Sequence, residues 1–136
     1  MEAMLKAFEG AGGKIADAPV GRYIYVSKDG DSSARKEVWP SICALVEHFR
    51  SHKLFLTSPL SENYLEPERF LDEIAITGSP KTVVEKIKEL RNSLGVQYLN
   101  CYASMYGYLS RELTLSSLEL ISRHVIPELA KPETQE

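Results

Sequence analysis

The fold of this chain is decided by residues 73–129, which read EIAITGSPKTVVEKIKELRNSLGVQYLNCYASMYGYLSRELTLSSLELISRHVIPEL. A short apolar run at 74–76 ends at the turn TGSP. In that turn Ser79 is a suitable N-cap, and Pro80 suits the first helical turn because it lacks an N–H that would stay unpaired there. The pattern predicts a strand at 74–76 and a helix that begins at Pro80.

The following residues continue this strand–helix alternation. Gly95 can adopt the left-handed conformation that ends a helix, and residues 96–102 read as the next strand. Apolar residues at spacings of three and four predict the helix before Gly95 and a last helix before Pro127. The first stripe is Val83, Val84, Ile87, Leu90 and Leu94, and the second is Leu115, Leu118, Ile121 and Val125. Strand, helix, strand, helix at this spacing predicts parallel strands joined by right-handed crossovers.

The first half of the chain predicts one more strand–helix unit after a short leading helix at 2–8. Residues 22–27 are rich in β-formers, and Ser32 or Ser33 can cap the helix that follows. Pro40 lies inside that helix and is expected to kink or split it. The segment 56–65 is irregular and long enough to be an inserted loop. The apolar side of the helix carries Val38, Ile42, Leu45, Val46 and Phe49.

We therefore predict an α/β fold with about three parallel βα units. Residues 1–130 form a single domain, and residues 131–136 form a disordered tail. An open parallel sheet of three strands leaves two unpaired edges and an uncovered face. We predict that dimerisation completes it, and the alternative is that segment 56–71 folds back over the exposed face.

Composition excludes several classes of function. The chain has 136 residues and a net charge of −3, which argues against a binder of nucleic acid because such a protein carries a basic face. No apolar run is long enough for a membrane span, and the first residues lack the apolar core of a signal peptide. These observations predict a cytoplasmic protein. Cys43 and Cys101 lack the spacing of a zinc site and are predicted to be buried, reduced thiols.

Three segments together resemble the C-terminal part of the bacterial-luciferase-like flavin-dependent monooxygenases, a family of (β/α)8 barrels. The first is VGRYIYV at 20–26, followed by an acidic turn and a helix. The second is ITGSP at 76–80 with the helix up to Gly95. The third is 113–129, which resembles the last helix of the barrel.

The resemblance implies that the three βα units correspond to the last part of a TIM barrel. Members of this family bind FMN or the deazaflavin F420 at the carboxyl-terminal mouth of the barrel and oxidise a small organic substrate. The chain lacks the earlier strands, whose loops supply much of the flavin contact in the family. We therefore expect a fragment or a truncated relative of a luciferase-like oxidoreductase that is catalytically incomplete alone. Its cofactor is FMN or F420 by resemblance, and the alternative is that this chain by itself binds neither. The alternative is a non-catalytic α/β module that acts through self-association or protein binding.

Two groups of residues are candidates for a site. Gly78 and Ser79 follow a strand and begin a helix, where free N–H groups favour an anion such as phosphate. The simpler alternative is a tight turn with an N-cap. The second group lies on or after the last strand and would face the mouth of an intact barrel: Asn100, Tyr102, Ser104, Tyr106 and Tyr108.

For each residue of the second group an alternative stays open. Tyr106 and Tyr108 can line a flat aromatic pocket or pack against a neighbouring loop or subunit. Asn100 shares a strand face with Tyr102 and is either a pocket residue or a hydrogen-bonded core amide. His48 and His52 are four apart on a helix, but without a supporting motif they are expected to be solvated surface residues rather than metal ligands. The sequence names no catalytic acid or base and no metal site.

Overall fold

Helix α5, Pro80–Leu94, has the bounds that its sequence predicts. The Ser79 hydroxyl accepts a hydrogen bond from the backbone N–H of Thr82 at 3.2 Å, and Pro80 occupies the first turn. Gly95 ends the helix in the left-handed conformation, with φ of 72°, which a residue with a Cβ adopts only under strain. These observations come from a computed structural model that describes residues 2–52 and 66–132. The predicted inserted loop at 56–65 and most of the predicted tail at 131–136 lie outside the described residues.

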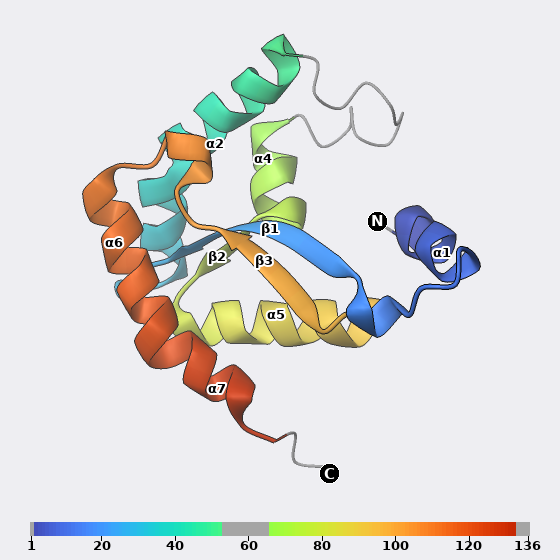
Figure 1. Ribbon diagram of the computed structural model, residues 1–136. Coiled ribbons are helices and arrows are strands. Elements are labelled where there is room, and N and C mark those ends of the chain that lie inside the picture. The colour runs from blue at the N-terminus through green and yellow to red at the C-terminus, as the bar shows by residue number, and fades with distance from the viewer. Residues whose placement is uncertain (1, 53–65, 133–136) are drawn as a thin grey trace.

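Three parallel strands form the sheet: β1 Pro19–Val26, β2 Ile76–Gly78 and β3 Tyr98–Tyr102. β1 lies in the middle, with β2 on one side and β3 on the other (Figure 1). The α/β class and the parallel direction are confirmed. β2 begins two residues later than predicted, because Phe70–Ile74 forms a π-helical turn after the short helix α4, Pro67–Arg69.

The strand order determines which face each helix covers. β3 pairs with β1 and not with β2, so the chain reverses its direction across the sheet after β2. When both crossovers are right-handed, such a reversal puts the two connecting helices on opposite faces. Figure 1 shows this arrangement, with α5 along one face of the sheet and α2, Asp31–Ser51, toward the other with α4. The expectation of a wholly uncovered face was therefore wrong.

Two apolar clusters fill the two sides of the sheet. Tyr25 of β1 faces the cluster of α2, and its neighbours Ile24 and Val26 face the cluster of α5, as the alternation of a strand requires. The α2 cluster consists of Tyr25, Ala34, Val38, Ile42, Leu45, Val46, Phe49, Phe70, Leu71, Ala75, Met105 and Leu109. The α5 cluster consists of Ile24, Val26, Ile76, Val83, Val84 and Val125. Phe70 and Leu71 come from the segment expected to fold back, and this part of it does cover the α2 side of the sheet.

The first helix packs on the start of β1. Helix α1, Glu2–Gly10, and the 3₁₀ turn Ile15–Asp17 precede the strand. Leu5 of α1 is buried with Ala18, Val20 and Val96 in a third, smaller cluster. This contact ties the amino-terminal end of β1 to the segment between α5 and β3.

Helix α2 differs from its prediction at two points. It begins at Asp31 after Gly30, and no side chain caps it, so neither Ser32 nor Ser33 is the N-cap. It also runs through Pro40 without a break. Proline removes the hydrogen bond to the carbonyl four residues earlier. Both Pro40 and Lys36 are exposed, so water can satisfy that carbonyl and the helix continues.

The last helical segment consists of α6 Arg111–Leu120, a π-helical turn Ile121–Val125, and α7 Ile126–Ala130. The predicted core stripe was wrong at Leu115, which is 54% exposed, and at Leu118, which is 43% exposed, whereas Val125 of the same stripe is buried in the α5 cluster. Ser117 is fully buried instead. Its hydroxyl accepts a hydrogen bond at 2.9 Å from the backbone N–H of Val26, the last residue of β1. Helix α6 therefore lies against the carboxyl end of β1 with a polar contact in place of the expected leucines.

We expect Ser117→Ala to lower the free energy of unfolding by about 1–3 kcal/mol, because it leaves the buried N–H of Val26 without an acceptor. Ser116→Ala is the matched control, since Ser116 is the exposed neighbour on the same helix. Urea denaturation of the two variants measures the difference. Equal midpoints would show that the bond at Val26 contributes nothing to stability.

The two cysteines differ in their exposure to solvent. Cys43 is half-buried, whereas Cys101 is exposed on β3, so the prediction of a buried thiol was wrong for Cys101. Both are free. Across residues 2–52 and 66–132, no helix has the length and apolar character needed to cross a membrane.

Candidate functional site

The turn at Gly78 and Ser79 is occupied by a side chain of the protein itself. Asp31, at the start of α2, points its carboxylate at the N-terminus of α5. Its Oδ1 accepts a hydrogen bond from the backbone N–H of Ser79 at 2.8 Å, and its Oδ2 accepts one from the Thr82 hydroxyl at 2.9 Å. The positive end of the helix dipole is thus paired with a carboxylate of α2.

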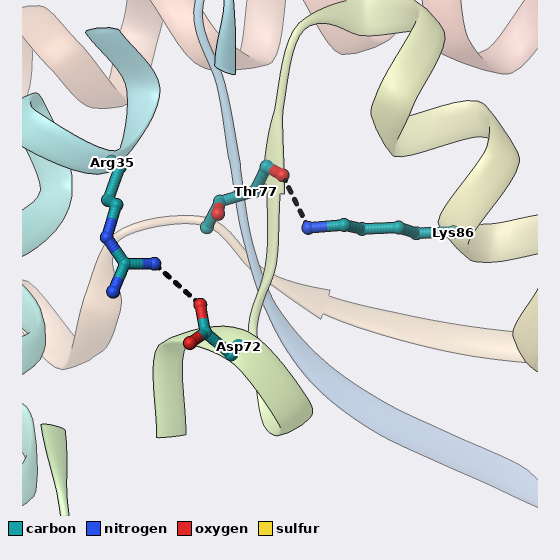
Figure 2. Close-up of polar contacts among 4 residues, drawn as sticks. All are labelled: Arg35, Asp72, Thr77 and Lys86. Atoms are coloured by element: carbon teal, nitrogen blue, oxygen red, sulfur yellow. Dashed lines mark hydrogen bonds and ion pairs between the residues drawn. The ribbon is translucent and has the colours of Figure 1, made fainter. Parts of the chain in front are cut away.

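Glycine is required at position 78 by this close contact. Its φ is +147°, and a Cβ built there would lie 2.7 Å from Asp31 Oδ1. Lys86 also reaches this end of the sheet, where its Nζ donates to the carbonyl of Thr77 at 2.9 Å (Figure 2). The turn therefore has the features of a tight, internally paired junction between α2, β2 and α5.

A second polar contact joins α2 to the segment before β2. Figure 2 shows the Arg35 guanidinium of α2 beside the Asp72 carboxylate, at 2.6 Å. Both side chains are about half exposed, so this ion pair adds little to stability. It joins the π-helical turn to α2 at the surface, beside the buried side chains of Phe70 and Leu71.

The contacts at α5 lower the pKa of Asp31 below its ordinary value of 3.8, chiefly through the backbone N–H of Ser79 and then the hydroxyl of Thr82. A carboxyl group whose pKa is lower in the folded chain stabilises the fold above its unfolded pKa. This contribution is lost as the pH falls through the folded pKa.

We expect Asp31→Ala to lower the free energy of unfolding by about 1 kcal/mol at pH 7, the usual effect of losing a cap. The difference from the unsubstituted chain should shrink below about pH 4.

Thermal unfolding at pH 7 and at pH 3 measures this difference. Asp29→Ala is the control, because Asp29 is exposed in the turn before α2. A cost for Asp31→Ala that is equal at both pH values would show that the carboxylate charge does not act at α5.

The second candidate group lies on the other side of β1. Tyr102 of β3 is paired in register with Tyr23 of β1, and their ring centroids are 5.1 Å apart. The Tyr102 ring lies over Gly21, where a Cβ would come within 2.7 Å of it. We call Tyr23, Tyr102, Tyr106, Tyr108 and His48 the tyrosine surface.

His48 links the two remaining tyrosines of this surface to α2. Its ring lies 4.8 Å from that of Tyr106, and its Nδ1 forms a hydrogen bond with the Tyr108 hydroxyl at 3.1 Å. The sequence interpretation of His48 as a solvated residue was wrong, because it is half-buried in these contacts. No signal in the chain places α2 beside the loop after β3, so sequence reasoning could not find it.

The loop after β3 holds Tyr106 outward under backbone strain. In the 3₁₀ turn Met105–Gly107, both Met105, with φ of 51°, and Tyr106, with φ of 59°, are left-handed. Each such residue costs on the order of 1–3 kcal/mol, and such strain tends to occur at functional sites. Met105 is fully buried, whereas Tyr106 is 62% exposed. The buried methionine anchors a turn that presents Tyr106 to solvent.

The phenols of the tyrosine surface are close enough to influence one another. Burial raises the pKa of Tyr23 above its ordinary value of 10.0, and the neighbouring Tyr102 and Tyr106 raise it further. Tyr23 therefore stays protonated at neutral pH and can donate a hydrogen bond but not act as a base. The surface offers aromatic faces and hydroxyl groups.

The other two residues of the second group lie differently from their predictions. Asn100 is exposed on β3, so the interpretation as a core amide was wrong. Ser104 shapes the loop through its backbone, since its carbonyl accepts from the N–H groups of Gly107 and Leu109 at 3.0 and 3.1 Å. The structure thus gathers three tyrosines of the loop and strand around His48 and Tyr23, and keeps them apart from Gly78 and Ser79 across β1.

An open hollow of about 370 Å³ lies along the first half of α2, separate from both groups. It is lined by Ser32, Arg35, Lys36, Trp39, Pro40 and Glu68. In the part of the chain that the structure describes, no three His, Cys, Asp or Glu side chains come together as a set that could hold a metal ion.

Comparison with known proteins finds a similar solved structure. Neither a protein-family model nor a curated protein matches the chain. Its structure is similar to that of a type II Baeyer–Villiger monooxygenase, the oxygenating constituent of 3,6-diketocamphane monooxygenase from the CAM plasmid of Pseudomonas putida, in complex with FMN. The TM-score is 0.59 at 23% identity, and the match covers 93% of this chain and 38% of the enzyme.

This likeness concerns the fold. It bears out the prediction of three parallel βα units that correspond to part of such an enzyme. The chain spans well under half the length of the enzyme. The sequence did not predict the spatial order of the strands in the sheet, which is β2-β1-β3.

Proposed function

We propose that this chain is part of a luciferase-like flavin-dependent monooxygenase, or a truncated relative of one, and is catalytically incomplete alone. The observation that carries the proposal is the likeness of 93% of the chain to an enzyme solved with FMN. The FMN-dependent enzymes of this kind act on small organic substrates, and we extend that substrate class to the parent of this chain. F420 is the other flavin-type cofactor consistent with the proposal.

The two candidate groups fit a flavin unequally. The tyrosine surface offers exposed aromatic rings, including Tyr102 and Tyr106, on which a flat ring system can stack. The N-terminus of α5 does not fit a flavin phosphate, because the carboxylate of Asp31 already accepts from Ser79 and Thr82 there. A phosphate beside that carboxylate would be repelled. We therefore assign no phosphate to Gly78 and Ser79 and derive no catalytic step through the cofactor.

The second candidate function is a non-catalytic module that acts through self-association or protein binding. It is favoured by the same pairing of Asp31 with α5, and by strand β3, whose side chains Tyr98, Asn100 and Tyr102 are exposed. We include a homo-oligomer in both proposals, since an open strand edge favours association.

Titration of the purified chain with FMN, followed by flavin fluorescence, tests the proposal. Saturable quenching at one flavin per chain supports it, and Tyr106→Ala should then weaken binding at least tenfold. Tyr98→Ala is the matched control, because Tyr98 is an exposed tyrosine at the opposite end of β3. No saturation at high micromolar FMN and F420 would refute flavin binding by this chain and leave the non-catalytic module.

A further inference from the structure

The free edge of β3 is the feature on which this inference stands. β3 pairs with β1 along one edge, and within residues 2–52 and 66–132 no strand pairs along its other edge. Proteins usually protect such an edge with lysine, proline or a bulge. The five residues of β3, Tyr98-Leu99-Asn100-Cys101-Tyr102, contain neither charge nor proline. Four of them are exposed, and Leu99 is half-buried.

The sequence of β3 is nearly symmetric about Asn100. A tyrosine stands two residues to either side of it, and a small or medium apolar residue stands one residue to either side. When a twofold axis relates two antiparallel strands, residue i of the first copy faces residue j of the second, and residue j of the first faces residue i of the second. Residues at equal distances on either side of the axis therefore face each other. A strand with matching ends is therefore suited to pair with itself.

We propose that β3 pairs antiparallel with β3 of a second copy of this chain, with the twofold axis at Asn100. Tyr98 then lies opposite Tyr102 of the partner subunit, and Asn100 lies opposite its own counterpart. Directly opposite residues have Cβ atoms about 4.5–5.5 Å apart, and aromatic pairs at this spacing stabilise a sheet. The result is a continuous sheet of six strands in the order β2-β1-β3-β3-β1-β2.

Other registers lose this match. Moving the axis to Leu99 places Tyr98 opposite Asn100 of the partner subunit and leaves Tyr102 without an aromatic partner. A shift by one residue puts the tyrosines of the two copies on opposite faces, because side chains alternate along a strand. Among these registers, only the one centred on Asn100 places each tyrosine of β3 opposite a tyrosine of the partner subunit on the same face.

This inference rests on the self-association proposed above and names its surface. The interface is short and lies at the small end of known interfaces, so we expect dissociation in the micromolar range. The pairing uses the backbone edge of β3 with Tyr98 and Tyr102, so it shares only Tyr102 with the tyrosine surface and does not involve Tyr106 or His48.

Disulfide cross-linking tests the register. In a Cys43→Ala, Cys101→Ser background, Tyr98→Cys of one copy is mixed with Tyr102→Cys of a copy that carries a size tag. We expect the mixed dimer to form under mild oxidation at least tenfold faster than a dimer of either variant alone, since like positions lie about 13 Å apart. Asn92→Cys, exposed at the end of α5, is the control for random collision. Cross-linking of the mixture at the rate of that control overturns the proposal.

Light scattering tests the surface itself. Asn100→Lys places two positive charges opposite each other at the axis and is expected to give a monomer at concentrations where the unsubstituted chain is a dimer. Asn92→Lys is the control of equal charge, and circular dichroism shows whether each variant is folded. A dimer that persists in folded Asn100→Lys would mean that association uses another surface. A monomeric unsubstituted chain at 100 micromolar would refute self-association as well.

Discussion

Replacing Leu45 with alanine is expected to lower the free energy of unfolding by about 2–5 kcal/mol, the usual cost of a large cavity in a core. Leu45 has no exposed surface and belongs to the cluster that joins α2 to Tyr25 of β1 and to Phe70. A cavity there weakens the packing of α2 against both of these segments, since few neighbours can move to fill it. Urea denaturation followed by circular dichroism measures the loss. A loss of stability below 1 kcal/mol would show that α2 does not pack on this face of the sheet.

Leu115→Ala is the matched control, since it makes the same change on a helix where the side chain is 54% exposed. We expect a change within about 0.5 kcal/mol, as for other surface substitutions. A loss comparable to that of Leu45→Ala would mean that α6 buries this leucine against a partner. The two variants together therefore also test whether Leu115 lies outside the buried core, as its exposure indicates.

Local signals in the sequence were enough to predict the elements whose ends depend on neighbouring residues. Helix α5 is the clearest case, because Ser79, Pro80 and Gly95 each act within one turn of the position they determine. The parallel direction of the strands followed from the alternation of strands and helices. These features need no knowledge of distant contacts.

The arrangement of the elements could not be predicted in the same way. The position of β3 beside β1 depends on which edge is free when α5 ends, and no residue in the turn encodes that choice. Apolar spacing predicted that Leu115 and Leu118 face the core. Helix α6 instead turns Ser117 inward, because the N–H of Val26 needs an acceptor. A periodic pattern identifies an apolar face but not the surface against which it packs.

In the candidate site too, local signals predicted some features, whereas others depend on contacts between distant parts of the chain. Gly78 and Ser79 were expected at a strand–helix turn and lie there, but the carboxylate that occupies the turn comes from Asp31, far earlier in the chain. The tyrosines after β3 were expected either to line an aromatic pocket or to pack against a neighbouring loop or subunit. Their contact with His48 depends on how α2 passes the loop, and sequence spacing carries no information about that.

Gly78→Ala is expected to lower the free energy of unfolding by about 3 kcal/mol, through two effects that can be separated. The backbone at φ of +147° favours glycine, and a left-handed conformation of this kind costs other residues about 1–3 kcal/mol. The new Cβ would also lie 2.7 Å from Asp31 Oδ1 and 2.9 Å from Thr82 Cγ2, which pushes the carboxylate off the N-terminus of α5. Urea denaturation at pH 7 measures the total.

Gly30→Ala isolates the first effect, because Gly30 has φ of +103° and no atom of the described residues lies within 4 Å of a Cβ built there. We expect it to cost about 1–2 kcal/mol less than Gly78→Ala, the difference being the loss of the Asp31 contacts. Combining Gly78→Ala with Asp31→Ala should then give a cost smaller than the sum of the two, since residues in contact couple by about 0.5–3 kcal/mol. Strict additivity would contradict the pairing of Asp31 with α5 and would reopen that turn as a binding site for phosphate.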